Sequence, residues 1–164
     1  MNQIRALTKP DWESVRSIYL TGISTGQATF ETEAPTWERW HENHLPEPRL
    51  VAATDEHIVG WAALSRVSRR PVYEGVAEVS VYVEEPSRGQ GIGSMLLTAL
   101  VNQSEKSGIW TLQASIFPEN AGSIALHKSC EFREVGTRHR IGKMKGVWRD
   151  TVLFERRSKS VGND

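Results

Sequence analysis

The stretch VAEVSVYVEEPSRGQGIGSMLLTAL, residues 76–100, decides the fold. Its first part, residues 76–83, alternates between two kinds of side chain in the period-two pattern of a β-strand. The apolar residues Val79, Val81 and Val83 share one face, and Glu78 points away from them. We therefore expect a strand with one valine face and an opposite face that carries a carboxylate.

A glycine-rich turn, RGQGIG at residues 88–93, joins this strand to a helix. A helix N-terminus presents free backbone N–H groups and a positive dipole end, which together bind a pyrophosphate. Gly89, Gly91 and Gly93 allow close approach of the backbone, and Arg88 adds a permanent charge. The spacing is neither the G-x-G-x-x-G fingerprint of dinucleotide folds nor a Walker loop. The sequence predicts a phosphate-binding turn of another kind.

The patterns on both sides of this stretch predict the order of elements. Strands are expected at residues 4–7, 50–53, 57–64, 110–116, 132–139 and 148–155. Helices are expected from Thr8 to about Thr21, from Thr36, from the glycine turn to near Gly108 with a buried stripe of Met95, Leu96, Ala99 and Leu100, and from Pro118 to about Cys130. The segment 22–35, rich in Gly, Thr and Ser, is expected to be a loop that covers a pocket.

This order predicts an α/β (α+β) fold with a mixed central sheet of six to seven strands, flanked by about four helices. A single domain is expected over residues 1–155, followed by a frayed polar tail over residues 156–164.

The composition narrows the class of protein. Twenty basic and twenty acidic residues cancel, which argues against nucleic acid or an anionic membrane as a partner and favours a small-molecule substrate. The single Cys130 cannot form an internal disulfide, and no Cys or His cluster has zinc spacing, so no metal is expected. The sequence has no apolar run of signal-peptide or membrane-span length. We expect a cytoplasmic protein.

The residues 88–93, after the strand 79–83, resemble the R/Q-x-x-G-x-G/A cofactor motif of the GNAT acetyltransferases. The resemblance extends over residues 4–155, because NAGSIALH at residues 120–127 is similar to the family's second cofactor segment. It implies a GNAT-type acyltransferase fold and an acetyl-CoA-dependent N-acetyltransferase. The cofactor-binding residues that it implies are Val81, Tyr82, Val83, Arg88, Gly89, Gln90, Gly91, Ile92, Gly93, Ser94, Asn120 and Ser123.

Three stretches resemble the phosphinothricin and methionine sulfoximine acetyltransferase subgroup: ATFE at 28–31, RRPVY at 69–73 and KGVWRD at 145–150. The resemblance implies an acceptor that is a small amino acid or its analogue. It implies substrate-binding roles for Phe30, Glu31, Arg69, Arg70 and Tyr73. The subgroup more often has two arginines one residue apart, so Arg66 is another candidate; the other reading of these arginines is a solvated loop.

The chemistry requires a neutral amine, a stabilised oxyanion and a proton for the departing thiolate. Glu78 resembles the subgroup's general base; the alternative is an exposed strand residue paired with a nearby arginine. A main-chain N–H near Tyr82 or Val83, freed by a splay or bulge, would bind the thioester oxygen. His127 stands where the family often has a tyrosine acid, and it is either that acid or a packing residue. Glu131 replaces the family's usual glycine, which leaves the geometry of that turn open but not the fold.

Four other functions remain open at this point. The acceptor could instead be a polyamine, an aminoglycoside or a protein N-terminus, although the arginines at 66–70 disfavour polycations. The chain could also be an acyl-CoA-binding module without turnover. We expect a homodimer, because Trp37, Trp40 and Trp61 exceed what one small core requires, and we expect Trp148 in the core.

Overall fold

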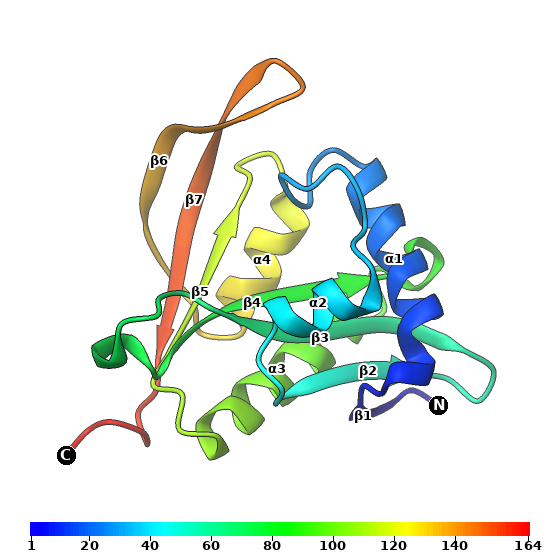
Figure 1. The fold of residues 1–164 in the computed structure, drawn as a ribbon, viewed down its shortest axis with the longest axis horizontal. Coiled ribbons are helices and arrows are strands. Elements are labelled where there is room, and N and C mark those ends of the chain that lie inside the picture. The colour runs from blue at the N-terminus through cyan, green and yellow to red at the C-terminus, as the bar shows by residue number, and fades with distance from the viewer.

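A mixed seven-stranded sheet forms the centre of the molecule, described here for residues 1–164 from a computed structural model (Figure 1). Its strands are β1 (Gln3–Ala6), β2 (Arg49–Ala53), β3 (Ile58–Arg66), β4 (Val76–Val83), β5 (Thr111–Ile116), β6 (Arg133–Met144) and β7 (Val147–Arg157). The order across the sheet is β1-β2-β3-β4-β5-β7-β6. Only β4 and β5 are parallel neighbours. The predicted α/β class and the upper strand count are confirmed.

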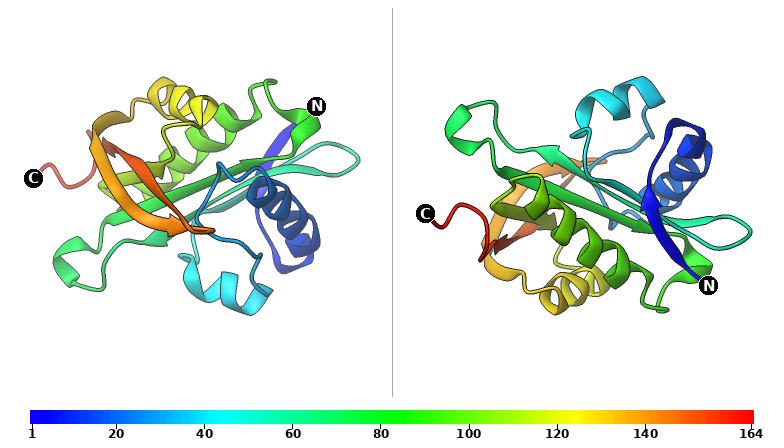
Figure 2. Two further views of the ribbon diagram at one scale, coloured as in Figure 1. Left: turned by 90° about the horizontal axis from the view of Figure 1, so that it is seen from above. Right: turned by 90° about the horizontal axis from the view of Figure 1, so that it is seen from below.

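Four α-helices cover the two faces of the sheet (Figure 2). The helices α1 (Trp12–Ser24) and α2 (Trp37–Asn43) lie on one face, and α3 (Ile92–Lys106) and α4 (Ala121–Ser129) lie on the other. Local signals begin two of them: Thr36 accepts a hydrogen bond from the Arg39 N–H at the start of α2, and Asn120 accepts one from the Ser123 N–H at the start of α4. The predicted helix count is confirmed.

The two faces of the sheet have different cores. The α3 face is aliphatic, and α3 buries Ile92, Leu96, Leu97, Leu100, Val101 and Ser104 against the strands. The prediction that Met95 is buried is wrong, since it is 39% exposed. The apolar stripe of α3 runs through positions 92, 96, 97, 100, 101 and 104, and Met95 lies beside it, toward solvent.

The α1 face is aromatic. Trp40 and Trp61 are fully buried there, with ring centroids 5.6 Å apart, and Trp12 packs 5.7 Å from Trp40. Trp37 is packed against the edge of this cluster. One subunit therefore accommodates these tryptophans, and they provide no argument for a dimer.

The hairpin of β6 and β7 extends beyond the rest of the sheet, where Figure 1 shows it rising above β5. The turn at Lys145 and Gly146 has positive φ at both residues, as tight hairpins require. Both strands are longer than predicted, at 12 and 11 residues. Trp148 lies in the protruding part and is 48% exposed, so its prediction as a core residue is wrong. The alternation around Trp148 resembles a half-buried strand, but no second layer covers this part of the hairpin.

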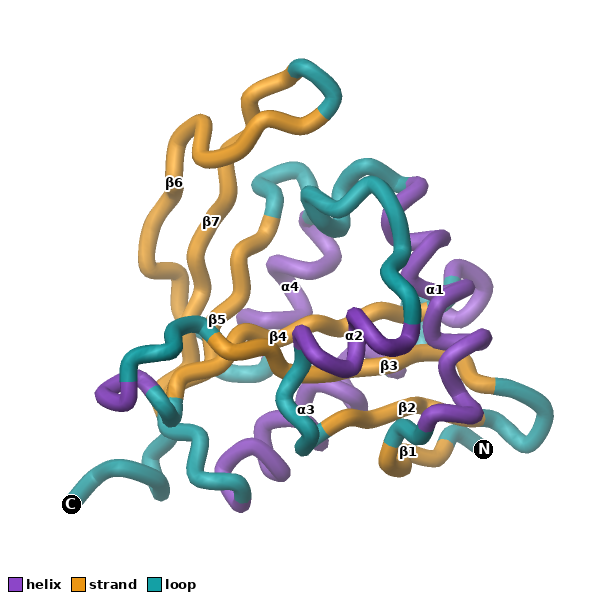
Figure 3. Tube along the Cα trace, viewed as in Figure 1, coloured by secondary structure: helices purple, strands orange, loops and turns teal.

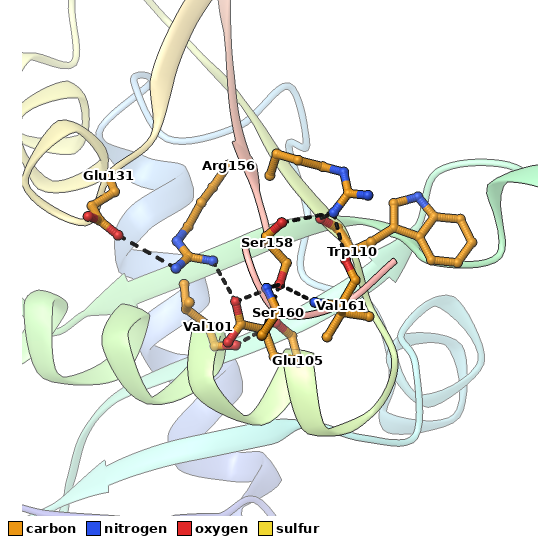
Figure 4. Close-up of polar contacts among 10 residues, drawn as sticks. Val101, Glu105, Trp110, Glu131, Arg156, Ser158, Ser160 and Val161 are labelled. Carbon is orange, nitrogen blue, oxygen red and sulfur yellow. Dashed lines mark hydrogen bonds and ion pairs between the residues drawn. The ribbon is translucent and has the colours of Figure 1, made fainter. Parts of the chain in front are cut away.

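The C-terminal tail is anchored rather than frayed. Strand β7 runs to Arg157, and Ser158 is only 4% exposed. The Arg156 guanidinium bonds Glu105 at 3.0 Å and lies 3.6 Å from the Glu131 carboxylate, while the Ser158 hydroxyl donates to the same Glu105 oxygen at 2.9 Å (Figure 4). These contacts tie the end of the chain to α3. We call Glu105, Glu131, Arg156 and Ser158 the C-terminal network.

None of the helices is long and apolar enough to span a lipid bilayer.

Candidate active site

The site begins where β4 and β5 separate. The two strands pair only from Val76 to Glu78 on β4 and from Thr111 to Gln113 on β5, and they diverge beyond these residues (Figures 1 and 3). Strand β4 remains paired with β3 as far as Val83, without a register shift. The splay, rather than a bulge, therefore leaves the last residues of β4 without a neighbouring strand on the β5 side.

A cavity of about 1060 Å³ fills this splay. Its walls are the second half of β4, the turn before α3, the end of β5, the first part of α4 and the segment between α1 and α2, residues 25–36, which we call the roof loop. The predicted site residues that the structure brings together here are Phe30, Glu78, Val81, Tyr82, Val83, Arg88, Gly89, Gly91, Ile92, Gly93, Ser94, Asn120, Ser123 and His127. The expected loop over a pocket is confirmed, although α1 extends to Ser24.

The glycine-rich turn has the geometry that an anion site requires. Gly89 and Gly91 have φ of 75° and 82°, values that favour glycine. No side chain caps α3, so the N–H groups of its first turn are free where the turn borders the cavity. The Arg88 Nε donates to the Val83 carbonyl at 3.1 Å, which holds the guanidinium beside the turn. The uncapped donors and this charge fit a pyrophosphate. Gln90 does not line the cavity, and its amide bonds Pro86.

Glu78 lies at the closed end of the splay. It accepts hydrogen bonds from the Gln113 side chain at 3.4 Å and from the Ser115 hydroxyl at 3.3 Å, both to Oε1. Both bonds are long, and Oε2 has no protein partner. No arginine forms an ion pair with this carboxylate. The alternative reading, a strand glutamate neutralised by a nearby arginine, therefore has no counterpart in the structure.

His127 is 4% exposed and lies on α4 with its ring edge-on to Phe132. Its Nδ1 is 2.7 Å from the Ser123 carbonyl oxygen, which can only accept, so Nδ1 carries the proton. Burial lowers the pKa of the ring, and the bond to Ser123 offsets this only in part. Nε2 is buried without a partner. The lowered pKa favours the neutral ring, whose Nε2 is an acceptor enclosed by protein.

Tyr82, which lines the cavity, belongs to an aromatic stack. Tyr82 has its ring centroid 5.0 Å from that of Tyr19 and 4.8 Å from that of Trp61. Burial raises the pKa of Tyr82, so its hydroxyl stays protonated at neutral pH. The Gly22 backbone lies against the same ring, because a Cβ there would come within 2.7 Å of it. The end of α1 is therefore packed directly on the cavity wall.

The roof loop is joined to α4 and to the hairpin. The Asn120 amide donates to the Gln27 carbonyl at 3.1 Å while its oxygen caps α4. Arg149 on β7 donates to the Gly26 carbonyl at 2.8 Å and to the Gln27 side chain at 2.7 Å. Its guanidinium lies 3.9 Å from the ring centroid of Phe117. The only signal for Arg149 in the sequence is its place within KGVWRD, residues 145–150.

Several predicted substrate residues lie elsewhere. Glu31, Arg69, Arg70 and Tyr73 do not line the cavity, and neither does Arg66. Arg66 belongs to β3, and Arg69, Arg70 and Tyr73 belong to the connection between β3 and β4. All four lie at the end of β4 opposite to the phosphate turn. Arg70 lies over the Tyr73 ring at 5.5 Å, and both are exposed. Within one subunit these arginines match the solvated-loop reading.

No three His, Cys, Asp or Glu side chains converge as a metal site.

Comparison with known proteins identifies the class. Residues 3–132 match the acetyltransferase (GNAT) family. A putative phosphinothricin acetyltransferase of Bacillus subtilis is 33% identical, with 93% of this chain and 97% of that protein covered. The L-methionine sulfoximine/L-methionine sulfone acetyltransferase of Pseudomonas aeruginosa is 32% identical, with 93% and 92% covered.

Solved structures agree. A phosphinothricin acetyltransferase of Sinorhizobium meliloti in complex with acetyl-CoA has a TM-score of 0.85 at 27% identity, with 99% of this chain and 96% of that chain covered. A ribosomal-protein-alanine N-acetyltransferase of Brucella melitensis has a TM-score of 0.88 at 31% identity, with 95% and 99% covered. The chain belongs to the GNAT family. It is an N-acetyltransferase that uses acetyl-CoA, as the cofactor motif implied.

Proposed function

We propose that the protein transfers the acetyl group of acetyl-CoA to the primary amine of a small amino acid or a close analogue such as phosphinothricin or methionine sulfoximine. The observation that carries this is the position of Glu78, an unpaired carboxylate in the same cavity as the phosphate-binding turn. The names of the B. subtilis and P. aeruginosa relatives support the acceptor class.

Glu78 acts in this proposal as the general base. An amino acid enters as an ammonium ion, which has no lone pair, so its nitrogen must lose a proton before it attacks the thioester carbon. Oε2 of Glu78 has no protein partner and is available to take this proton, directly or through a water. The carboxylate sits where β4 and β5 part, away from the phosphate turn, and we propose that the acetyl group is transferred at this end of the cavity.

The remaining roles follow the walls of the cavity. The free N–H groups of residues 89–94 bind the pyrophosphate beside the Arg88 guanidinium, and Asn120 and Ser123 line the path of the pantetheine. An N–H of β4 near Tyr82 or Val83 stabilises the oxyanion, because the splay leaves this side of β4 unpaired. His127 as the acid for the thiolate stays a prediction, and its geometry opposes it: the proton is on Nδ1, bonded to Ser123, while Nε2 has none to give.

Recognition of the acceptor is proposed to involve Phe30, which lines the cavity. Arg69, Arg70 and Tyr73 can serve this role only if a homodimer brings them to the cavity of the other subunit. The proposed homodimer therefore links two predictions, and loss of activity on dilution to monomers would test both. The charge balance and the single Cys130 support a cytoplasmic location and no nucleic-acid partner.

The test is release of thiol from acetyl-CoA with phosphinothricin, methionine sulfoximine, methionine sulfone, spermidine and a peptide with an N-terminal alanine. The variant Glu78→Gln keeps the shape of the side chain and removes the base. We expect its kcat to fall by about 10²–10⁴-fold, the usual contribution of a general base. The dissociation constant for acetyl-CoA, measured by calorimetry, should stay unchanged. Glu74→Gln, an exposed position outside the cavity, is the matched control.

The outcomes separate the competing functions. Turnover limited to the three amino acids supports the proposal. Turnover only with the peptide, as the B. melitensis neighbour would suggest, or only with spermidine keeps the chemistry and overturns the acceptor. Acetyl-CoA binding without any turnover indicates a binding module, and unchanged turnover in Glu78→Gln removes Glu78 as the base.

A further inference from the structure

One pair of residues on the β6/β7 hairpin contacts the roof loop. Gly142 on β6 and Arg149 on β7 are register partners, directly opposite each other. Strand β7 pairs with β5 only from Val152 onward, so this pair lies in the protruding part of the hairpin (Figure 1). Gly142 lies against Phe30, and Arg149 binds Gly26 and Gln27. The hairpin therefore packs against the roof loop from outside the cavity.

Gly142 is required by the close approach of the Phe30 ring. A Cβ at position 142 would lie 2.6 Å from Cζ and 2.7 Å from Cε1 of Phe30, closer than carbon atoms pack. The backbone at Gly142 does not have positive φ, so alanine meets no backbone strain there. An added methyl group would thus move the ring, which is the end of a flexible side chain, and leave the strand in place.

The surroundings restrict where the ring can go. Phe30 packs edge-on against Phe117, with ring centroids 4.9 Å apart, and both line the cavity. Arg149 fixes Gly26 and Gln27, a few residues before Phe30, and Asn120 holds the Gln27 carbonyl. The loop backbone just before Phe30 is therefore held by both β7 and α4. A ring pushed away from β6 moves toward the cavity that it lines.

We propose that Gly142 is a specificity-determining residue that sets the depth of the acceptor pocket by seating the Phe30 ring against β6. The inference rests on the proposed function, because it assumes an acceptor whose side chain ends against Phe30. It predicts that a larger residue at position 142 excludes acceptors by length and leaves the chemistry at Glu78 unchanged.

The experiment compares methionine sulfone with ethionine sulfone, which is one methylene longer at the tip. One methylene in an apolar pocket changes kcat/KM by about 10-fold or more. We expect Gly142→Ala to lower kcat/KM for ethionine sulfone about 10-fold more than for methionine sulfone. Gly136→Ala is the matched control on the same strand, because a Cβ there meets no atom within 4 Å. The double variant Gly142→Ala with Phe30→Leu should restore the longer acceptor.

Three results would overturn the inference: an equal loss for both acceptors, the same discrimination in Gly136→Ala, or no restoration by Phe30→Leu. Failure of the proposed function is recognised separately, because the wild-type protein would then acetylate neither sulfone. In that case thermal unfolding still tests the contact. The shifts in the unfolding midpoint of Gly142→Ala and Phe30→Leu should be non-additive in the double variant, and additive shifts would show that the two residues are not coupled.

Discussion

The two ends of α3 lie in polar regions that are built in opposite ways. At its N-terminus the cavity leaves polar groups open to a ligand: no side chain caps the helix, and Oε2 of Glu78 has no protein partner. At its C-terminus the C-terminal network pairs its charges, with Glu105 bonded to both Arg156 and Ser158 (Figure 4).

This difference shows which polar groups bind a ligand and which stabilise the fold. A free donor or acceptor in a cavity is a place for a ligand, and it costs free energy until one arrives. A paired group stabilises the fold and has nothing left to offer a substrate. Substitutions at the two ends of α3 should therefore have opposite signatures, with lost activity at one end and lost stability at the other.

The largest effect on stability is expected in the C-terminal network. Glu105→Ala removes the acceptor shared by Arg156 and Ser158, so the free energy of unfolding should fall by about 2 kcal/mol, within the range for hydrogen bonds to charged groups. For a chain of this size this lowers Tm by about 4–8 °C. Calorimetry measures the shift, and kcat/KM should stay within about twofold if the comparison between the two ends of α3 holds. Lys106→Ala, an exposed neighbour, should change neither.

The next effect is expected at the other end of the helix. Arg88→Ala removes the charge beside the uncapped N-terminus, and we expect KM for acetyl-CoA to rise about 10-fold, which corresponds to about 1.4 kcal/mol. Raising the ionic strength should weaken acetyl-CoA binding less in this variant than in the wild type. A drop in Tm without a change in KM would break the comparison, because Arg88 would then be a structural residue that holds Val83.

The smallest effect depends on pH. Arg5 binds Asp11 through both carboxylate oxygens, at 2.8 and 2.9 Å, and this bond lowers the pKa of Asp11 from 3.8 to about 2. A lowered carboxyl pKa contributes stability above the unfolded value and loses it as the pH falls through the folded value. Because Arg5 is 40% exposed, we expect Asp11→Asn to cost only about 1 kcal/mol at pH 7.

The ion pair of Arg5 and Asp11 also predicts how the stability lost in Asp11→Asn varies with pH. The gap in unfolding free energy between wild type and Asp11→Asn should narrow below about pH 4, as Asp11 of the wild type becomes protonated, and urea titrations at several pH values would measure it. A gap that stays constant down to pH 2 would mean that the Asn side chain disrupts the turn at Thr8 rather than the ion pair.

Side-chain exposure shows where prediction from sequence stops. The strand at 76–83 and the cap at Thr36 were predictable, because each depends on residues within one or two turns of the chain. The exposure of Met95 and of Trp148 was not, because the same apolar pattern occurs whether or not a second layer covers that position.

By itself, then, the sequence determined the glycine-rich turn after a strand, the glutamate on the face opposite to the valines, and the order of elements, since all three follow from local backbone preferences and side-chain periodicity. Only the tertiary structure decided that β4 and β5 part after Glu78, that the arginines at 69 and 70 lie outside the cavity, and that Arg149 and Gly142 support its roof. The physical reason is distance along the chain. Arg149 is 123 residues from Gly26, and only packing of the whole sheet brings such partners together.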